Sequence, residues 1–426
     1  MKRKSILTKS VILLVIILPF VSCQKTKTNE LIFSEKFVKI VPENAAINIA
    51  LSFNPSVFFN RYNLKNNSNT KSSLTGNNKI KTKYLFNDSH GIPALYIFNF
   101  EDNGGFLFVS ADYQLEPILG YVEKGEFKKE VAPAGAINWV NKTMENIEIV
   151  RKGEYDNSLI ANKAWETYFK LNNNKSPIIS RVDPVPDDCT DDVWTSYGVG
   201  PLLPVTWGQG CTYNDMCPNL SCNSGCGLAW TGCVATSTAQ IVNYWQPTNN
   251  FAYNYASMPS GSGNGEVQRL MRDLGNSVGM SYGCAGSGAN AANVAPSLKN
   301  AFGFSSANFV DYDYQRVKTN LNNNWPVLLD GCATQTGHWF IINWWNSYTD
   351  CHEWVCDGYQ AYNVTFCENG HLSGGAGYLY FHMNWGWHEV GLTNDFNGWF
   401  AFSNWNIPGL NRNYQYAQDL TSEIHP

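Results

Sequence analysis

The chain has 426 residues, of which 44% are hydrophobic and 15% charged, and its formal net charge is −5 at pH 7. These proportions describe a globular chain of two or three domains at about 150 residues each, and they exclude an intrinsically disordered one. Beyond the N-terminus there is no dense run of Lys and Arg. The charge therefore excludes the basic surface that a nucleic-acid-binding protein needs.

The first 23 residues are predicted to be an export signal that ends in a lipidation site. Residues 1–4 are basic, and residues 11–21 form an apolar run that is short for a membrane span. Phe20-Val21-Ser22-Cys23 resembles a bacterial lipobox, although leucine is usual where Phe20 stands. We therefore expect a protein of the cell envelope, anchored through Cys23 to the outer membrane, or a secreted protein if cleavage falls near Ser22.

Residues 24–180 are predicted to form a small α+β domain that has no cysteine after Cys23. Pro42 stands at a helix start, and apolar residues follow it at helical spacing. Strand-like runs come next, and the first two flank the hairpin signal Glu-Asp-Asn-Gly. The expected elements are a helix with Ala46, Ile49, Ala50 and Phe53, strands within 94–100, 105–112 and 118–127, and a helix with Ile137, Val140, Met144 and Ile147.

Two polar stretches are predicted to be flexible. Residues 63–78 are poor in apolar side chains and form an insert. Residues 172–188 contain prolines and no periodicity, which is typical of an exposed linker that proteases cut. We therefore expect a cleavable N-terminal domain and a second domain over residues 189–426.

The second domain is predicted to begin with helices and continue with strands. Helical spacing follows Cys233, recurs in Val267, Leu270, Met271 and Leu274, and covers 292–302. Strand-like runs then lie within 326–331, 338–344, 353–358, 378–385 and 398–405. This order favours an α+β fold with two unlike lobes and a cleft between them.

The cysteines indicate an oxidised domain with a free thiol. Apart from Cys23, all eleven remaining cysteines lie at or beyond Cys189. An odd number in an exported chain suggests one unpaired thiol, and with Cys233 in that role the other ten allow up to five disulfides. A zinc site at Cys217, Cys222 and Cys226 is the weaker alternative.

The stretch TGCVATSTAQIVNYW, residues 231–245, places Cys233 where a helix begins. The positive end of the helix dipole stabilises a thiolate, so the pKa of this thiol is expected to be lowered. Gly232 permits a tight turn, and Val234, Ala235 and Ala239 are small enough for the helix to be buried. A buried structural cysteine is the alternative for this stretch taken alone.

Other motifs supply the remaining parts of a Cys-His-Asn site. Gln209 lies in a Gly-flanked turn, where its amide and the Cys233 backbone N–H can form an oxyanion hole. His352 in CHEWVCDGY offers an imidazole acid/base, and Asn384 in FHMNWGWH offers an amide to orient it.

Together these motifs resemble the streptopain family of bacterial cysteine peptidases, family C10. The segments WGQG, TGCVATSTAQI, HEWVCDGYQ and MNWGW occur in the family's order over residues 190–405. The resemblance implies a papain-like fold in which Cys233 is the nucleophile, Gln209 the oxyanion donor and Asn384 the orienting residue. It also implies that Trp385 shields the His–Asn hydrogen bond from water. Residues 94–112 are similar to the streptopain prodomain, so residues 24–180 are expected to inhibit the peptidase intramolecularly.

The histidine motif departs from this family. Gly-His-Ala is usual there, whereas this chain has Cys351-His352-Glu353, and a Gly-His pair occurs earlier at His338. Residues 361–377 are a longer insertion than the family usually has. His352 is the preferred catalytic histidine because it opens a strand from a loop, and His338 is the alternative. His382 and His388 share the segment of Asn384, so they are poorly placed to be oriented by it.

The sequence thus predicts a lipid-anchored cysteine endopeptidase, made as a zymogen, that hydrolyses protein or peptide substrates through an acyl-enzyme. The chemistry requires no metal and no organic cofactor. Two alternatives remain open. One is a lipid-anchored glycan- or protein-binding protein whose aromatic strands form the site and whose Cys233 is structural. The other keeps the Cys-His pair in a transglutaminase or a cell-wall amidase.

Overall fold

The computed structural model describes residues 40–55, 78–153, 161, 162, 164–166, 168, 189, 193–340, 343–388, 395–402 and 416–426, which all belong to the unit Val38–Pro426. The predicted signal with Cys23, the insert 63–78 apart from Asn78, and the linker 172–188 lie outside these residues.

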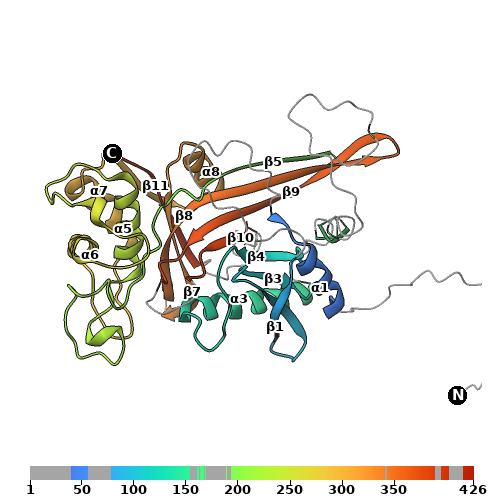
Figure 1. Ribbon diagram of the computed structural model, residues 1–426, viewed down its shortest axis with the longest axis horizontal. Helices are drawn as coiled ribbons and strands as arrows, with labels where there is room; N and C mark the ends of the chain where they lie inside the picture. Colours follow the sequence, from blue (N-terminus) through green and yellow to red (C-terminus); the bar gives the residue numbers. More distant parts are fainter. Residues whose placement is uncertain are drawn as a thin grey trace, which may run out of the picture. The chain divides into compact units, whose positions relative to one another are not determined.

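The N-terminal part is an antiparallel sheet with helices packed beside it (Figure 1). Helix α1 begins after Pro42 and buries Ala46, Ile49 and Ala50, as predicted. Strand β1 was not predicted, because it is the edge strand of the sheet and much of it is exposed and polar. The elements are α1 (Glu43–Ser52), β1 (Ile80–Asn87), β2 (Pro93–Phe100), β3 (Phe106–Ser110), β4 (Ile118–Val122) and α3 (Ala134–Arg151).

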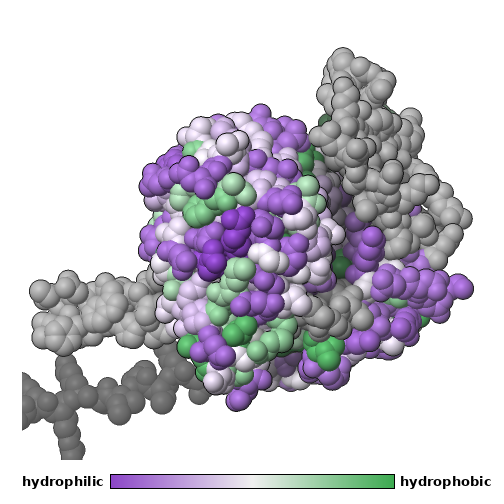
Figure 2. All heavy atoms as spheres, turned by 60° about the vertical axis from the view of Figure 1, so that its left-hand side comes forward, coloured by the Kyte–Doolittle hydropathy of each residue, from purple (hydrophilic) through white to green (hydrophobic). Residues whose placement is uncertain are grey.

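The predicted helices of the second domain all form and lie together on one side of the sheet (Figure 1). Helix α6 begins at the side-chain cap of Asn264 and turns Val267, Leu270 and Leu274 into the core. On the face that Figure 2 draws, apolar residues form small patches among hydrophilic ones. The elements are η1 (Gly225–Gly227), α5 (Cys233–Trp245), η2 (Tyr255–Ser257), α6 (Gly265–Val278), η3 (Ala291–Asn293) and α7 (Val294–Ala301).

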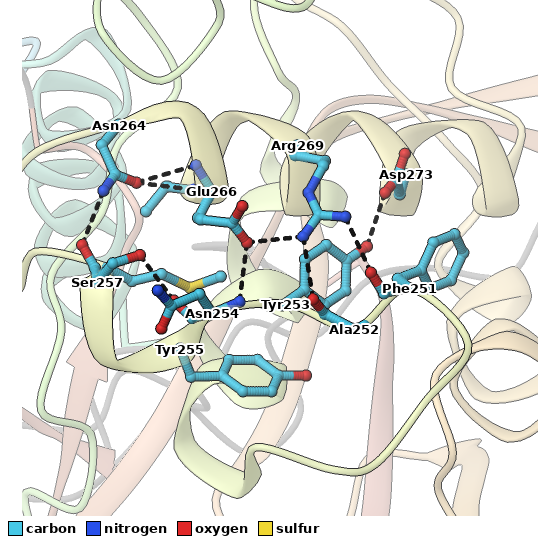
Figure 3. A network of polar contacts seen from close by, with 12 residues as sticks. Phe251, Ala252, Tyr253, Asn254, Tyr255, Ser257, Asn264, Glu266, Arg269 and Asp273 are labelled. Carbon is cyan, nitrogen blue, oxygen red and sulfur yellow. Dashed lines mark hydrogen bonds and ion pairs between the residues drawn. The ribbon is translucent and has the colours of Figure 1, made fainter.

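A polar network fastens the loop around η2 to helix α6 (Figure 3). The Glu266 carboxylate accepts hydrogen bonds from the Asn254 backbone N–H and from Arg269. Arg269 also donates to the Phe251 carbonyl, and the Tyr253 hydroxyl donates to Asp273. These contacts hold the loop against the outer part of the helical lobe.

The C-terminal part is built on long antiparallel strands. Residues 338–344 and 353–358, predicted as separate strands, belong to one continuous pair, β7 with β8. Strands β5, β6 and β11 and helix α8 were not predicted. The elements are β5 (Val193–Val199), β6 (Ser306–Asp311), α8 (Tyr314–Asn322), β7 (Val327–Phe340), β8 (Asn343–Glu368), β9 (His371–Asn384), β10 (Gly398–Ala401) and β11 (Tyr416–His425).

The two parts share one 11-stranded sheet in the order β1-β2-β3-β4-β10-β9-β8-β7-β11-β6, with β5 paired to β8. The junction is the antiparallel pair β4–β10, in which Tyr121 faces Trp399 and Gly120 faces Phe400. Two buried hydrophobic clusters combine side chains from both sides of this junction. The N-terminal part therefore docks by extending the sheet of the C-terminal part.

The insertion 361–377 lengthens the β8–β9 pair. The two strands run out together as a ribbon with β5 alongside (Figure 1). Near the end of the ribbon Cys367 is bonded to Cys189. Tyr362 and Tyr378 stack on each other at 4.4 Å between ring centroids and belong to a cluster that contains Tyr168 of the N-terminal part. The insertion thus enlarges the surface on which the N-terminal part packs.

The cysteines differ from the expectation of one free thiol. The disulfides are Cys189–Cys367, Cys211–Cys226, Cys222–Cys284 and Cys332–Cys351. In addition to Cys233, two other cysteines of the described residues, Cys217 and Cys356, have free thiols, and both are buried. Cys356 lies in a core cluster of the sheet, whereas Cys217 lies in the loop before η1. Because Cys222 and Cys226 belong to different disulfides, the zinc alternative is also wrong.

Candidate active site

Cys233 is the first residue of α5, as the sequence predicted. Gly232 precedes it with φ 88, a conformation that favours glycine, and a Cβ added there would lie 2.7 Å from the Met280 sulfur. The helix behind the thiol is buried from Val234 to Asn243. The start of the helix is therefore held rigidly, with the sulfur at its N-terminal end.

The pKa of Cys233 is raised to about 11, first because the thiol is buried and also because the Glu353 carboxyl lies near it. The backbone N–H groups of Glu353, Val234 and Cys233 act in the opposite direction. The expectation of a lowered pKa is therefore wrong for this state of the molecule. Desolvation outweighs the helix N-terminus.

His352 lies in β8 opposite Gly331 of β7. Its Nε2–H donates to the Trp385 carbonyl over 2.8 Å, and its ring lies 5.2 Å from the ring of Trp387. Burial lowers the pKa of His352 to about 4. The lowered pKa of His352 and the raised pKa of Cys233 both disfavour a thiolate–imidazolium pair in this arrangement.

Asn384 ends β9, opposite Val355 of β8, and is buried. Its Nδ2 donates to the Val205 carbonyl over 2.9 Å, while its Oδ1 has no partner among the described residues. Trp385 follows and stacks on Trp387 at 4.9 Å. The hydrogen bond expected between Asn384 and His352 is not made here, and Trp385 meets His352 through its carbonyl.

Gln209 reaches the same segment from the other lobe. The Gln209 side-chain Nε2 donates to the Gly386 carbonyl over 3.3 Å. The Gln209 backbone carbonyl accepts from the backbone N–H of Thr231, two residues before Cys233. The neighbouring Gly208 leaves no room for a side chain, because an added Cβ would lie 1.5 Å from the His388 carbonyl oxygen. Gln209 thus lies between the nucleophile segment and the Asn384–Trp387 turn.

The sequence profile of the Peptidase C10 family matches residues 207–399, and that of the Spi protease inhibitor matches residues 39–147. Residues 207–399 are a peptidase domain of the C10 family. The chain is a cysteine peptidase with an inhibitor-type prodomain, which confirms the resemblance drawn from its motifs.

Individual relatives agree with this C10 membership. The chain is 24% identical to the thiol protease/hemagglutinin of Porphyromonas gingivalis over 364 residues, which are 76% of this chain and 36% of that protein. It is 25% identical to streptopain of Streptococcus pyogenes over 345 residues, 70% of this chain and 72% of streptopain. A prointerpain A fragment of Prevotella intermedia superimposes with a TM-score of 0.52 at 23% identity, covering 82% of this chain and 99% of the fragment. This likeness supports the α+β, papain-like fold.

The other histidines of the C10 chain make different contacts. His382 Nδ1 lies 2.6 Å from Asp357, and His388 Nδ1 lies 3.7 Å from Asp395. His371 is the first residue of β9 and pairs with Glu368 of β8 at the end of the ribbon. The backbone of His338 pairs with Trp345 in the β7–β8 hairpin, but its side chain is outside the described ones.

Sequence reasoning missed Glu353 as a member of the site. Its side chain is buried, and its Oε1 lies 2.5 Å from the Ser237 hydroxyl, one turn along α5 from Cys233. In the sequence, Glu353 stands out only as a departure from the usual Gly-His-Ala motif. Its position near the nucleophile is known from the fold alone.

Proposed function

We propose that the chain is a latent, exported endopeptidase of the cell envelope, anchored through lipidated Cys23, in which residues 24–180 inhibit residues 189–426 until the linker 172–188 is cut. Protein and peptide chains are its substrates. Of the helices in the described part of the chain, none has the length and apolar character needed to cross a bilayer. Lipidation and export rest on the lipobox-like sequence and on the disulfide content.

In the active form the Cys233 thiolate attacks the peptide carbonyl carbon, and its S–C bond forms as the carbonyl oxygen becomes an oxyanion. The backbone N–H of Cys233 and the Gln209 amide donate to that oxygen. His352 as imidazolium protonates the leaving amine, the C–N bond breaks, and water then hydrolyses the thioester. Asn384 orients the ring, and Trp385 excludes water from their hydrogen bond.

The observation that supports latency is that His352 and Asn384 do not make the hydrogen bond that catalysis needs. The His352 ring donates to the Trp385 carbonyl rather than to Asn384, and burial favours the neutral forms of both the imidazole and the Cys233 thiol. The Asn384 Oδ1 is buried without a described partner, which costs free energy that a hydrogen bond from His352 would recover. A movement of His352 away from the Trp385 carbonyl would free its N–H to supply that bond.

The prodomain supports the inactive position of His352 through Trp387. Helix α3 approaches so closely that a Cβ added at Gly135 would lie 2.3 Å from the Trp387 ring. Trp387 in turn stacks on Trp385 and contacts the ring of His352. Removal of α3 would free this stack, so the prodomain controls the histidine and not only access to the cleft.

Gly135→Leu is expected to weaken latency, because any side chain at this position collides with Trp387. Full-length protein carrying this change should process itself faster and hydrolyse a fluorogenic peptide sooner than the parent chain. Gly265→Leu is the matched control, since it also lies in the first turn of a helix but an added Cβ there meets nothing within 4 Å. If Gly135→Leu and the parent chain began to hydrolyse the peptide after the same delay, that result would contradict the role of the α3–Trp387 contact.

A thiol-directed epoxide probe tests the function itself. After cleavage of the linker, the probe should label Cys233, as located by mass spectrometry, and should block hydrolysis of casein. A binding protein with a structural Cys233 would remain unlabelled under the same conditions. A labelled enzyme that transfers added amines to glutamine side chains and leaves casein intact would instead be a transglutaminase.

A further inference from the structure

Glu353 is a buried carboxyl between the nucleophile helix and the sheet. Only 2% of the residue is exposed, and its Oε2 has no partner among the described residues. Of the described lysines and arginines, none forms an ion pair with it. A carboxylate in such a place would lack the compensation that buried charges require.

The hydrogen bonds of Ser237 explain how this carboxyl is accommodated. The Ser237 oxygen lies 2.5 Å from Glu353 Oε1 and 3.2 Å from the Val234 carbonyl. A serine hydroxyl has one proton, so it cannot donate to both oxygens at once. An un-ionised Glu353 resolves this, because its O–H donates to Ser237 while the Ser237 hydroxyl donates to Val234.

Glu353 is also the end of a row of carboxyl groups on adjacent strands. In register, Glu353 of β8 faces Asp330 of β7, Asp330 faces Asp419 of β11, and Asp419 faces Asp311 of β6. Directly opposite residues share one face of a sheet, with Cβ atoms about 4.5–5.5 Å apart, and like charges there are destabilising. Negative charge on adjacent members of the row is therefore unfavourable while the strands stay paired.

The acid–base behaviour of the row agrees with this geometry. Burial and Asp419 raise the pKa of Asp330 to about 8, and burial and Asp330 raise the pKa of Glu353 well above its ordinary range. The pKa of Asp419 is raised by burial and by Asp311. Because the native state holds these protons, the stability contributed by Asp330 is complete below its ordinary value of 3.8 and is lost as the pH rises through about 8.

Glu353 also acts on the thiol of Cys233. The Glu353 carboxyl contacts Ser237, which lies one turn along α5 from Cys233. The backbone N–H of Glu353 lowers the pKa of Cys233, whereas its carboxyl raises that pKa and, as a carboxylate, would oppose a thiolate. The groups that face Glu353 are thus Ser237 and Cys233 from α5 and Asp330 from β7, with Asp419 and Asp311 further along the row. In Figure 1, α5 lies beside the strands that carry it.

We propose that Glu353 is a positioning residue that holds an un-ionised carboxyl beside the nucleophile and makes formation of the Cys233 thiolate depend on protonation of the carboxyl row. As an acid, Glu353 bridges β8 to α5 through Ser237. When it ionises, its charge opposes the thiolate. The importance of this inference for catalysis rests on the proposed function, but its test does not.

The test is the pH dependence of Cys233 alkylation by iodoacetamide in the full-length chain, which requires no catalytic turnover. Glu353→Gln keeps a donor for Ser237 but cannot ionise as the pH is raised, so no charge develops against the thiolate and the apparent pKa of Cys233 should fall by about one unit. Glu353→Ala should lower it in the same direction and should also lower the thermal midpoint, because the bridge is lost. Glu266→Gln, in the network of Figure 3, is the control and should leave the alkylation profile unchanged.

Alkylation curves of both Glu353 variants that superimpose on the parent curve would overturn the proposal. A shift in Glu353→Ala alone would also overturn it, because it would assign the effect to packing and not to charge. If instead the curves shift as expected while processed parent protein cleaves no peptide, the proposed peptidase function fails and the coupling between Glu353 and Cys233 stands.

Discussion

Replacement of Cys233 by alanine is expected to abolish peptide hydrolysis, with kcat lowered by at least about 10⁴-fold. Alanine fits the start of α5, since it is smaller than cysteine and forms helices well. The loss should therefore be chemical and leave the thermal midpoint nearly unchanged. Casein hydrolysis is measured after both chains have been cut in the linker by the same added protease, so that latency does not account for the difference.

Cys217→Ala and Cys356→Ala are the matched controls for this change, because each removes another free thiol of the same chain. Both thiols are buried, and burial raises the pKa of Cys217 to about 11. These variants should lose some stability through the small cavities they create and keep their turnover. A Cys233→Ala protein that still cleaved casein would remove the basis of the proposed mechanism.

His352→Ala should also stop turnover, lowering kcat by roughly 10³-fold or more, and it should act differently before and after processing. In the full-length chain, His352 donates to the Trp385 carbonyl and is neutral at pH 7, so its loss should leave the alkylation profile of Cys233 unchanged. In the processed enzyme, an imidazolium next to the thiolate lowers the thiol pKa, and His352→Ala should raise it.

His338→Ala provides the comparison, since His338 belongs to the adjacent strand β7. It is expected to lower the thermal midpoint and leave the thiol pKa of the processed enzyme about where it was. The reverse pattern, in which His338→Ala shifts the alkylation profile and His352→Ala does not, would transfer the catalytic role to His338. The peptidase proposal would survive that result, but the argument from CHEWVCDGY would not.

Local patterns were reliable where the relevant energies are local. Helices α1, α5 and α6 follow from apolar spacing and, for α1, from Pro42 at its start. Strand β1 and helix α8 escaped notice, because the first is largely exposed and polar and the second has few apolar residues. Their positions are stabilised by neighbours from other parts of the chain, which a window of adjacent residues does not contain.

The residue types and their order, with the resemblance they carry, were enough to indicate a cysteine peptidase with a prodomain, because nucleophile, acid/base and amide are chemical identities written directly in the chain. The pairing of the cysteines and the joining of β4 to β10 were decided by the tertiary structure, since both depend on contacts between distant segments. The tertiary structure also decided the protonation of the groups around Cys233. Glu353 meets Ser237 across 116 residues of sequence, and the burial that this contact creates determines whether the groups around Cys233 carry charge.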